Sequence, residues 1–241
     1  MKKLVIRQMV FEVTRKCNVK CKHCLRGKAE AVDMDTSHIA KFFKRVNALS
    51  DVTFSGGEPS LVPYIIDNIM HIAKEKSIPF DNFYIATNGV KQLPDFIRVI
   101  MELYLYCDSN EISAVKVSRD QYHREVTARP KPSLLDILVI TQEESSDYHP
   151  EGLIAEGRAK KFPRARENRE DTPRYYYDDE NDDIMIVEEM TVYLNVHGDL
   201  INGCDWSYES QKDHMITNVT KDNWMGEFIE YVLEHGEQEN Y

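Results

Sequence analysis

The sequence lacks any run of the roughly 18 to 20 apolar residues that a membrane-spanning helix needs. Its first residues, MKKLVIRQMVF, begin like a secretory signal, but Arg7 and Gln8 interrupt the apolar run and no small-residue cleavage site follows. We therefore expect a protein of the cytoplasm. Hydrophobic residues still make up 42% of the chain, which is enough for a sizeable core and excludes an intrinsically disordered protein.

Basic residues and cysteines are also scarce. The chain has 30 Lys and Arg against 41 Asp and Glu, for a formal net charge of −11. This balance weighs against nucleic acid as a partner, because proteins that bind it usually present a basic face. The five cysteines are an odd number, and three of them lie within residues 17–24, which is a poor framework for disulfides. In a reducing compartment such a cluster more often indicates metal or redox chemistry.

Short β-rich runs alternate with helical periodicity from residue 9 to about residue 141. In chain order, the predicted elements are strand 9–14, a helix capped at Asp35 or Thr36 with its last apolar residue at Leu49, strand 51–55, helix 65–73, strand 83–87, helix 95–106, strand 113–118 and strand 134–141. Such alternation predicts βαβ units around a parallel sheet, and hence an α/β fold.

The alternation ends near residue 143. Residues 143–183 are rich in charge and poor in apolar anchors, so we expect a loop-rich insertion there, inside a first domain of residues 1–183. Residues 184–241 are predicted to form a smaller C-terminal extension that packs on the first domain. Its expected elements are a hairpin within 190–205 and a last helix at about 222–235.

The stretch CNVKCKHC at residues 17–24 raises the question of why three cysteines are gathered and not four. A structural zinc ion normally takes four protein ligands, so zinc would need Cys107 or Cys204 as a distant fourth, because His23 is badly placed. A four-iron cluster is normally held by four thiolates, one per iron, so three thiolates leave one iron open for a substrate or cofactor. Taken alone, the loop leaves both alternatives open.

Three stretches in the first half of the chain resemble the radical S-adenosylmethionine (radical SAM) enzymes. The spacing C-x3-C-x2-C, with an aromatic side chain before its last cysteine, is similar to the cluster loop of that family. SGGEP at 55–59 follows the strand DVTF, as the Gly-Gly-Glu motif does in the family, and TNG at 87–89 ends the next strand. The resemblance implies a partial (β/α)6 TIM-like barrel, open at the side, with the hairpin and last helix as a small C-terminal extension.

The resemblance also implies the cofactors and the reaction. Cys17, Cys21 and Cys24 are expected to hold a [4Fe–4S] cluster, whose open iron binds S-adenosylmethionine (SAM). Reductive cleavage of SAM then gives methionine and a 5′-deoxyadenosyl radical, which abstracts a hydrogen atom from the substrate. The implied protein partner is a low-potential electron donor of the flavodoxin or ferredoxin type.

The SGGEP stretch has a physical rationale as part of a cofactor site. Gly56 and Gly57 carry no Cβ, so the backbone can adopt positive φ and approach a ligand closely. The resemblance implies that the Glu58 carboxylate accepts a charge-assisted hydrogen bond from the ammonium group of SAM. Without the cysteine loop, a plain strand-to-helix turn would explain the same residues better.

The remaining candidate residues follow the ends of later strands or lie beyond them. The resemblance implies cofactor contacts for Asn88, Ser118 and Arg158, although an Asn-Gly turn, a polar loop cap and a solvated arginine are the ordinary alternatives. The catalytic residues are otherwise unknown, and the candidates on the substrate side are Asp120, Tyr122 and His123.

The segment GDLINGCDWS at 198–207 resembles the entry to the C-terminal extension of peptide-modifying family members, so the expected substrate is a ribosomally made peptide. Cys204 is the only cysteine after Cys107, and one thiol cannot hold the auxiliary clusters of larger relatives, which indicates a truncated extension. The alternatives are a small-molecule substrate, the activation of a glycyl-radical enzyme, a nucleobase- or tRNA-directed reaction, which the acidic charge disfavours, and a metal-stabilised binding module without catalysis.

Overall fold

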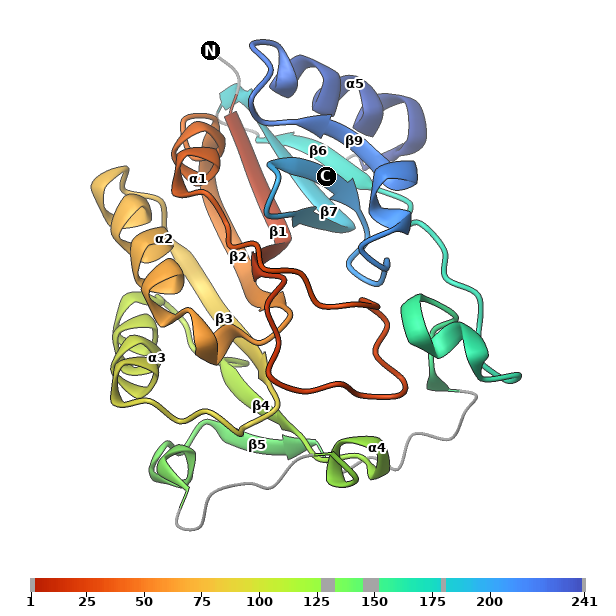
Figure 1. Cartoon of the computed structure of the whole chain (residues 1–241). Helices are drawn as coiled ribbons and strands as arrows, with labels where there is room; N and C mark the ends of the chain where they lie inside the picture. The colour runs from red at the N-terminus through yellow and green to blue at the C-terminus, as the bar shows by residue number, and fades with distance from the viewer. Residues whose placement is uncertain (1–2, 127–132, 145–151, 179–180, 240–241) are drawn as a thin grey trace.

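A computed structural model gives the fold, and it describes residues 3–126, 133–144, 152–178 and 181–239 (Figure 1). Ten strands of this part of the chain form one sheet in the order β10-β6-β7-β1-β2-β3-β4-β5, and β8 and β9 continue it from β7. The strands are β1 (Lys3–Thr14), β2 (Val46–Gly56), β3 (Phe80–Thr87), β4 (Ala114–Ser118), β5 (Thr141–Glu144), β6 (Arg174–Asp178), β7 (Asn181–Leu194), β8 (Asp199–Asn202), β9 (Met215–Asn218) and β10 (Glu237–Gln238).

Six neighbouring strands, β7, β1, β2, β3, β4 and β5, run parallel to one another. The helices α1 (Thr36–Phe42), α2 (Pro63–Glu75) and α3 (Pro94–Tyr106) connect β1 through β4 and lie together along one side of the sheet (Figure 1). The described residues of the connection from β4 to β5 form the short helix α4 (Gln121–Arg124) and one 3₁₀ helix. The predicted α/β fold, a partial barrel of parallel strands, is confirmed.

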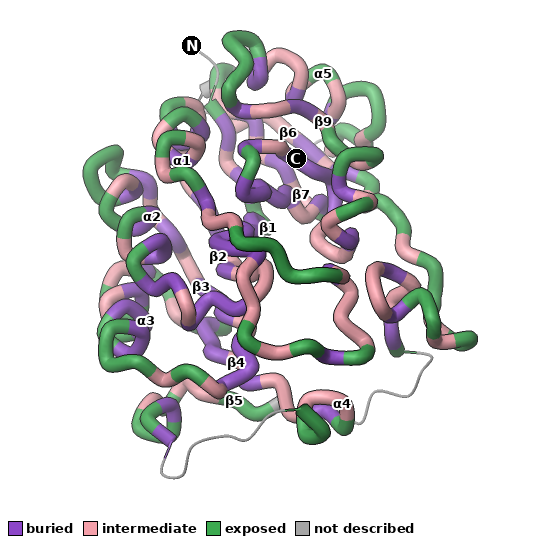
Figure 2. Tube along the Cα trace, viewed as in Figure 1, coloured by how far each residue is buried: buried purple, intermediate pink, exposed green. Residues whose placement is uncertain are grey.

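The core lies between the sheet and these helices, and the buried residues follow the strands (Figure 2). The apolar stripe predicted for the second helix is buried as expected, at Ile65, Ile66, Ile69, Met70 and Ala73. Because helices cover one face of the sheet, buried apolar residues alternate along β2 and β3 with half-buried ones that face the other side.

The first helix is shorter than predicted. It ends at Phe42, and Val46 and Leu49, which were expected to continue its apolar face, belong to β2. The backbone N–H of Leu4 donates to the carbonyl oxygen of Arg45 at 2.8 Å, and Leu4 pairs with Val46. From Val46 onward, hydrogen bonds between β1 and β2 therefore replace those of a helix. The helical spacing of the apolar residues gives no sign of this change.

The strand predicted at 134–141 is wrong for most of its length. Leu134–Ile137 form a 3₁₀ helix, and β5 begins only at the end of the predicted range. The backbone N–H of Leu134 donates to the side-chain oxygen of Gln92 at 2.6 Å, and the Ser133 hydroxyl donates to the same oxygen at 3.0 Å. These bonds fix the start of the 3₁₀ helix, so the chain joins the sheet only at Thr141.

The hairpin predicted within 190–205 is present as the antiparallel pair β7 and β8, and the last helix is α5 (Trp224–His235). β7 runs across the division predicted between residues 183 and 184, and it pairs with β1 along most of its length, so residues on both sides of that point belong to one sheet. Within the predicted charged insertion, β6 pairs with β7. None of the helices in the described ranges is long and apolar enough to cross a membrane.

A buried carboxylate joins the end of β1 to the C-terminal part of the chain. Glu12 is fully buried, and its Oε1 accepts from Nε of Arg15 at 2.6 Å. Its Oε2 accepts from the hydroxyl of Tyr193 at 2.6 Å and from Nε2 of Gln211 at 2.9 Å. The backbone N–H of Val196 lies 3.4 Å from Oε1, so every group that faces this carboxylate is a donor.

Replacing Glu12 with Gln is therefore expected to lower the free energy of unfolding by about 3 kcal/mol, because Arg15 loses its buried ion partner, keeping only the half-exposed Glu30, and an amide group faces donors. Urea unfolding followed by far-UV circular dichroism measures the change. Glu188→Gln is the matched control, because it removes a partly exposed pair with Arg7 and should cost less than about 1 kcal/mol. Equal losses in the two variants would contradict the role given to Glu12.

Candidate functional site

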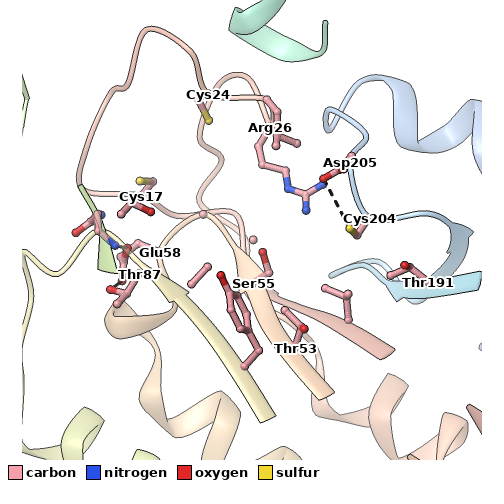
Figure 3. A pocket seen from close by; sticks show the side chains of 18 of the residues that line it. Cys17, Cys24, Arg26, Thr53, Ser55, Glu58, Thr87, Thr191, Cys204 and Asp205 are labelled. Atoms are coloured by element: carbon pink, nitrogen blue, oxygen red, sulfur yellow. Dashed lines mark hydrogen bonds between the residues drawn. The ribbon is translucent and has the colours of Figure 1, made fainter. Parts of the chain in front are cut away.

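A cavity of about 680 Å³ lies along the sheet and beyond the carboxyl ends of its parallel strands. It is lined by β1, β2 and β3, by the loop between β1 and α1 that carries three cysteines, and by the segment that follows β8 (Figure 3). We call residues 15–33 the cysteine loop. The cavity volume is in the range of small-molecule sites, and the carboxyl end of a parallel sheet is where α/β proteins place them.

The three cysteines of the loop face this cavity. Cys17 and Cys24 are half-buried and Cys21 is buried, all three as free thiols, and Figure 3 shows the sulfur atoms of Cys17 and Cys24 directed inward. Burial raises the pKa of the Cys17 thiol, and burial together with the neighbouring Cys24 and Cys17 raises the pKa of Cys21 to about 12. The loop thus gathers thiols that need a nearby positive charge to ionise, as a metal centre supplies.

The two glycines at the end of β2, Gly56 and Gly57, allow a close backbone crossing. The backbone N–H of Gly57 donates to the carbonyl oxygen of Thr14 at 2.7 Å, and that of Glu58 donates to Lys16 at 2.8 Å. A Cβ on Gly56, which has φ of 124°, would lie 2.2 Å from the oxygen of Thr14, and a Cβ on Gly57 would lie 2.1 Å from that of Lys16. Both glycines line the cavity, but the approach that requires them is to the base of the cysteine loop.

Glu58 is buried and ties the ends of β2 and β3 together. Its Oε1 accepts from the Thr87 hydroxyl at 2.5 Å and from the backbone N–H of Ser60 at 3.1 Å, and its Oε2 accepts from the backbone N–H of Asn88 at 2.8 Å. Burial raises the pKa of this carboxyl group, while the hydrogen bonds act in the opposite direction. Thr87, the first residue of the TNG stretch, was not singled out from the sequence, and it is the residue that orients Glu58.

Asn88, Ser118 and Arg158 have different surroundings. Asn88 and Ser118 line the cavity, and Nδ2 of Asn88 donates to the side-chain oxygen of Asn18 in the cysteine loop at 2.9 Å. Arg158 lies outside the cavity lining. Its Nε donates to the carbonyl oxygen of Cys21 at 2.7 Å and its Nη1 to that of Gly27 at 2.5 Å, so the arginine braces the cysteine loop.

Gly157, directly before this arginine, allows the backbone to approach the cysteine loop closely. Gly157 has φ of 51°, and a Cβ there would lie 2.3 Å from the oxygen of Leu25 and 2.8 Å from that of Cys24. The backbone N–H of Arg158 donates to Cys24 at 2.9 Å. On the other side, the Glu156 carboxylate accepts from the hydroxyl of Ser210 at 2.7 Å. The stretch EGRA, residues 156–159, therefore connects the cysteine loop to the C-terminal part of the chain.

Asp120, Tyr122 and His123 meet the cysteine loop through His23. Oδ2 of Asp120 lies 2.6 Å from Nδ1 of His123 and 3.5 Å from Nε2 of His23, and the His23 ring stacks on Tyr122 at 4.7 Å between centroids. Although burial opposes it, hydrogen bonding from His123 and His23 lowers the pKa of Asp120. Of the three predicted residues, His123 lines the cavity, Asp120 holds the His123 ring, and Tyr122 stacks on His23.

Within the described ranges, His23, Asp120 and His123 form the group of three or more ligand-type side chains whose atoms all lie within 4.8 Å of one another. The three thiols do not form such a group. Sulfur atoms that do not all lie within 4.8 Å of one another disfavour one shared zinc ion. They suit a cluster, in which each thiolate binds a separate iron.

Two buried polar atoms beside the cysteine loop also suit a cluster. Nδ1 of His23 and the hydroxyl of Tyr208 have no hydrogen-bond partner among the described residues, and the backbone N–H of Tyr208 donates to the carbonyl oxygen of Arg26. Hydrogen bonds from the protein to cluster sulfur are an ordinary feature of iron–sulfur sites. The residues present therefore fit a [4Fe–4S] cluster.

The wall of the cavity opposite Glu58 combines the cysteine loop with the C-terminal part of the chain. Arg26, Thr191, Cys204 and Asp205 line the cavity opposite Glu58 (Figure 3). Burial and then the neighbouring Asp205 raise the pKa of the Cys204 thiol to about 12. The segment that holds Cys204 was singled out from its resemblance, whereas Arg26, two residues after Cys24, and Thr191 were not singled out from the sequence.

The comparisons with known proteins agree with this geometry. The family model of the radical SAM superfamily matches residues 11–133, which is more than half of the chain. The chain belongs to the radical SAM superfamily, whose members are enzymes that use a [4Fe–4S] cluster and SAM. No curated protein matches the sequence.

Solved structures of the protein anSMEcpe share the fold. One of them, with bound AdoMet and the Cp18Cys peptide, has a TM-score of 0.56 and 11% sequence identity, over 97% of this chain and 82% of that chain. Another, with AdoMet and the Kp18Cys peptide, has a TM-score of 0.55 and 12% identity, over 96% and 82%. Streptococcus suis SuiB bound to its precursor peptide SuiA matches at a TM-score of 0.33 and 18% identity, over 47% of this chain and 24% of that chain.

Gly57→Ala is expected to reduce the iron and acid-labile sulfide bound per chain after anaerobic reconstitution, because the added methyl group displaces the base of the cysteine loop. Overpacking of this kind should also destabilise the metal-free protein by about 1–3 kcal/mol. Gly226→Ala in α5 is the matched control, because its added Cβ meets only the Asn223 side chain, which can rotate. An unchanged iron content in Gly57→Ala would show that the crossing does not shape the cluster site.

Proposed function

We propose that this radical SAM enzyme binds its [4Fe–4S] cluster through Cys17, Cys21 and Cys24 and modifies a ribosomally made peptide. The observation that carries the proposal is that these three thiols and the SGGEP stretch, separated by some thirty residues of chain, face one cavity. Cys17, Cys21 and Cys24 would hold the cluster, which would supply the one-electron reduction that the radical chemistry of SAM on the substrate requires. The protein's own contribution is to hold, orient and shield these groups.

The cysteine loop is held in shape from two sides. The crossing at Gly56 and Gly57 holds the start of the loop, at residues 14–16. Arg158 donates to the carbonyl oxygens of Cys21 and Gly27 in its middle part. In this proposal Arg158 is a positioning residue and does not touch the cofactor. Loop carbonyls that are already bound to a guanidinium keep the thiols in place before the cluster arrives.

SAM is assigned to the end of the cavity where β2, β3 and β4 finish. The carboxylate of Glu58 is fixed by donors from Thr87 and Asn88, so it is oriented to accept from the ammonium group of SAM without rearranging. Asn88 and Ser118 line the same end of the cavity and offer neutral hydrogen-bonding groups. The electron must come from a low-potential donor of the flavodoxin or ferredoxin type, and the exposed outer residues of the cysteine loop are where it can dock (Figure 2).

Two features support a peptide as the substrate. The cavity extends from the SAM end to the wall formed by Thr191, Cys204 and Asp205, which leaves room for a second molecule beside the cofactor. A structure that shares the fold over 97% of this chain holds a peptide together with AdoMet. The net charge of −11 weighs against the nucleobase- or tRNA-directed alternative. His123, held by Asp120, is the candidate for contact with the substrate on the β4 side.

Single replacement of Cys17, Cys21 or Cys24 by Ala is expected to abolish both cluster binding and formation of 5′-deoxyadenosine. Iron content and product are measured after anaerobic reconstitution, reduction and addition of SAM. Cys107→Ala is the matched control: this thiol is buried at the end of α3, in the core and away from the cavity lining, so the variant should keep cluster and cleavage. Full iron and activity in any one of the three loop variants would refute the assignment of ligands.

Deuterium transfer identifies the substrate class. Peptides labelled with deuterium at carbon should pass the label to 5′-deoxyadenosine, because the radical takes its hydrogen atom directly from the substrate. Mass spectrometry of 5′-deoxyadenosine measures the transfer, with labelled nucleosides and a glycyl-radical enzyme as comparison substrates. If label comes from one of the comparison substrates and from no peptide, the peptide assignment is wrong.

A further inference from the structure

Arg26 carries a positive charge that no carboxylate neutralises at contact distance. Its side chain is buried, with 9% of the residue exposed. Its Nη1 donates to the carbonyl oxygen of Trp206 at 2.7 Å, and its guanidinium carbon lies 4.8 Å from the centroid of the Tyr193 ring. Within the described ranges no carboxylate oxygen lies within 4.0 Å of this guanidinium. An arginine in such a position is expected to meet an anion.

The buried carboxylate of the same network is already committed elsewhere. Glu12 accepts from Nε of Arg15 at 2.6 Å, and its other oxygen accepts from Tyr193 and Gln211. The network thus contains two buried guanidinium groups and one fully buried carboxylate. Arg15 also reaches the half-exposed Glu30 at 3.1 Å, which leaves Arg26 as the group with surplus charge.

Arg26 lies at the end of the cavity away from the proposed SAM residues. Figure 3 shows Glu58 and Thr87 on one side and the Arg26 side chain reaching toward Cys204 and Asp205 on the other. The Cys204 thiol donates to Oδ1 of Asp205 at 3.7 Å. This wall therefore offers a guanidinium with unused donors, next to a neutral thiol and a carboxylate that lies beyond contact distance from it.

We propose that Arg26 is a specificity-determining residue that binds a carboxylate of the peptide substrate. The inference rests on the proposed function and deepens it, because it names the chemical group that the cavity recognises. A planar guanidinium shielded from bulk water binds a carboxylate through two parallel charge-assisted bonds, which fix orientation as well as position. The carboxylate can belong to an acidic side chain or to a free C-terminus, and the methionine carboxylate of SAM is a third source of the same chemistry.

Three pools of N-acetylated peptides of equal length test the proposal on reconstituted, SAM-loaded enzyme. The acidic pool contains one Asp or Glu and has an amidated C-terminus, and the amide pool has Asn or Gln at the same position. The third pool has no acidic residue but keeps a free C-terminal carboxylate. The measured quantity is the 5′-deoxyadenosine formed with each pool, after subtraction of the amount formed without peptide.

The wild-type enzyme is expected to respond at least about 30-fold more strongly to one of the two carboxylate pools than to the amide pool. The pool that responds identifies the source as a side chain or a terminus. Arg26→Gln should lose the preference, and Arg26→Lys should keep part of it. The ratio between pools is compared within each variant, so a partial loss of folded enzyme cancels. Arg98→Gln, at a partly exposed arginine on α3, is the matched control and should keep the wild-type ratio.

Equal responses of the wild-type enzyme to all three pools, or no response to any, would overturn the proposal, as would a preference that survives in Arg26→Gln. Equilibrium dialysis without peptide gives the Kd for SAM. If Arg26→Gln weakens SAM binding and keeps the peptide preference, Arg26 binds the cofactor carboxylate and the substrate assignment is wrong. Cleavage of SAM by the reduced wild-type enzyme is also recorded without peptide, and absence of cleavage both there and with every pool would refute the proposed function itself.

Discussion

The buried carboxylate of Glu12 is the constraint on which the rest of the site depends. It sits near the end of β1, directly before the cysteine loop, and it is surrounded by donors from Arg15, Tyr193 and Gln211. A fully buried charge is tolerated only when its partners are in place, because its desolvation is otherwise uncompensated. The beginning of the cysteine loop and the C-terminal part of the chain must therefore be assembled together, and the cavity forms between them.

The cysteine loop has little regular structure of its own, and its shape comes from its neighbours. The crossing at Gly56 and Gly57 brings the end of β2 against its base, and Gly157 and Arg158 contact its far part. Each of these contacts is made to backbone carbonyl oxygens, which are the groups that an irregular loop leaves unsatisfied. Two stretches that read as parts of a cofactor site, SGGEP and EGRA, thus act first as supports for the loop that carries the thiols.

The α/β fold, the hairpin of β7 and β8 and the last helix could be predicted from local patterns. In these elements the spacing of apolar residues matches the face that is buried. Where local and tertiary preferences competed, the prediction was wrong. Val46 and Leu49 suit a helix by spacing, but pairing with β1 draws them into β2. The apolar run at 134–141 suits a strand, but the backbone N–H of Leu134 donates to the Gln92 side chain and the chain forms a 3₁₀ helix there. Cross-strand and side-chain partners of this kind are distant in sequence, so no local window contains them.

The sequence by itself determined the class of chemistry through its resemblance to a family, because three cysteines at C-x3-C-x2-C and a Gly-Gly-Glu stretch after the next strand occur in the order that the radical SAM enzymes keep. Only the tertiary structure decided which other groups meet them. Arg26 carries no motif, and its role follows from burial without a contacting carboxylate, which is a property of the folded environment. Arg158 has the residue type of a cofactor ligand, yet in the folded protein its side chain donates to carbonyl oxygens of the cysteine loop. Residue type limits what a side chain can bind, and only its neighbours in space decide what it does bind.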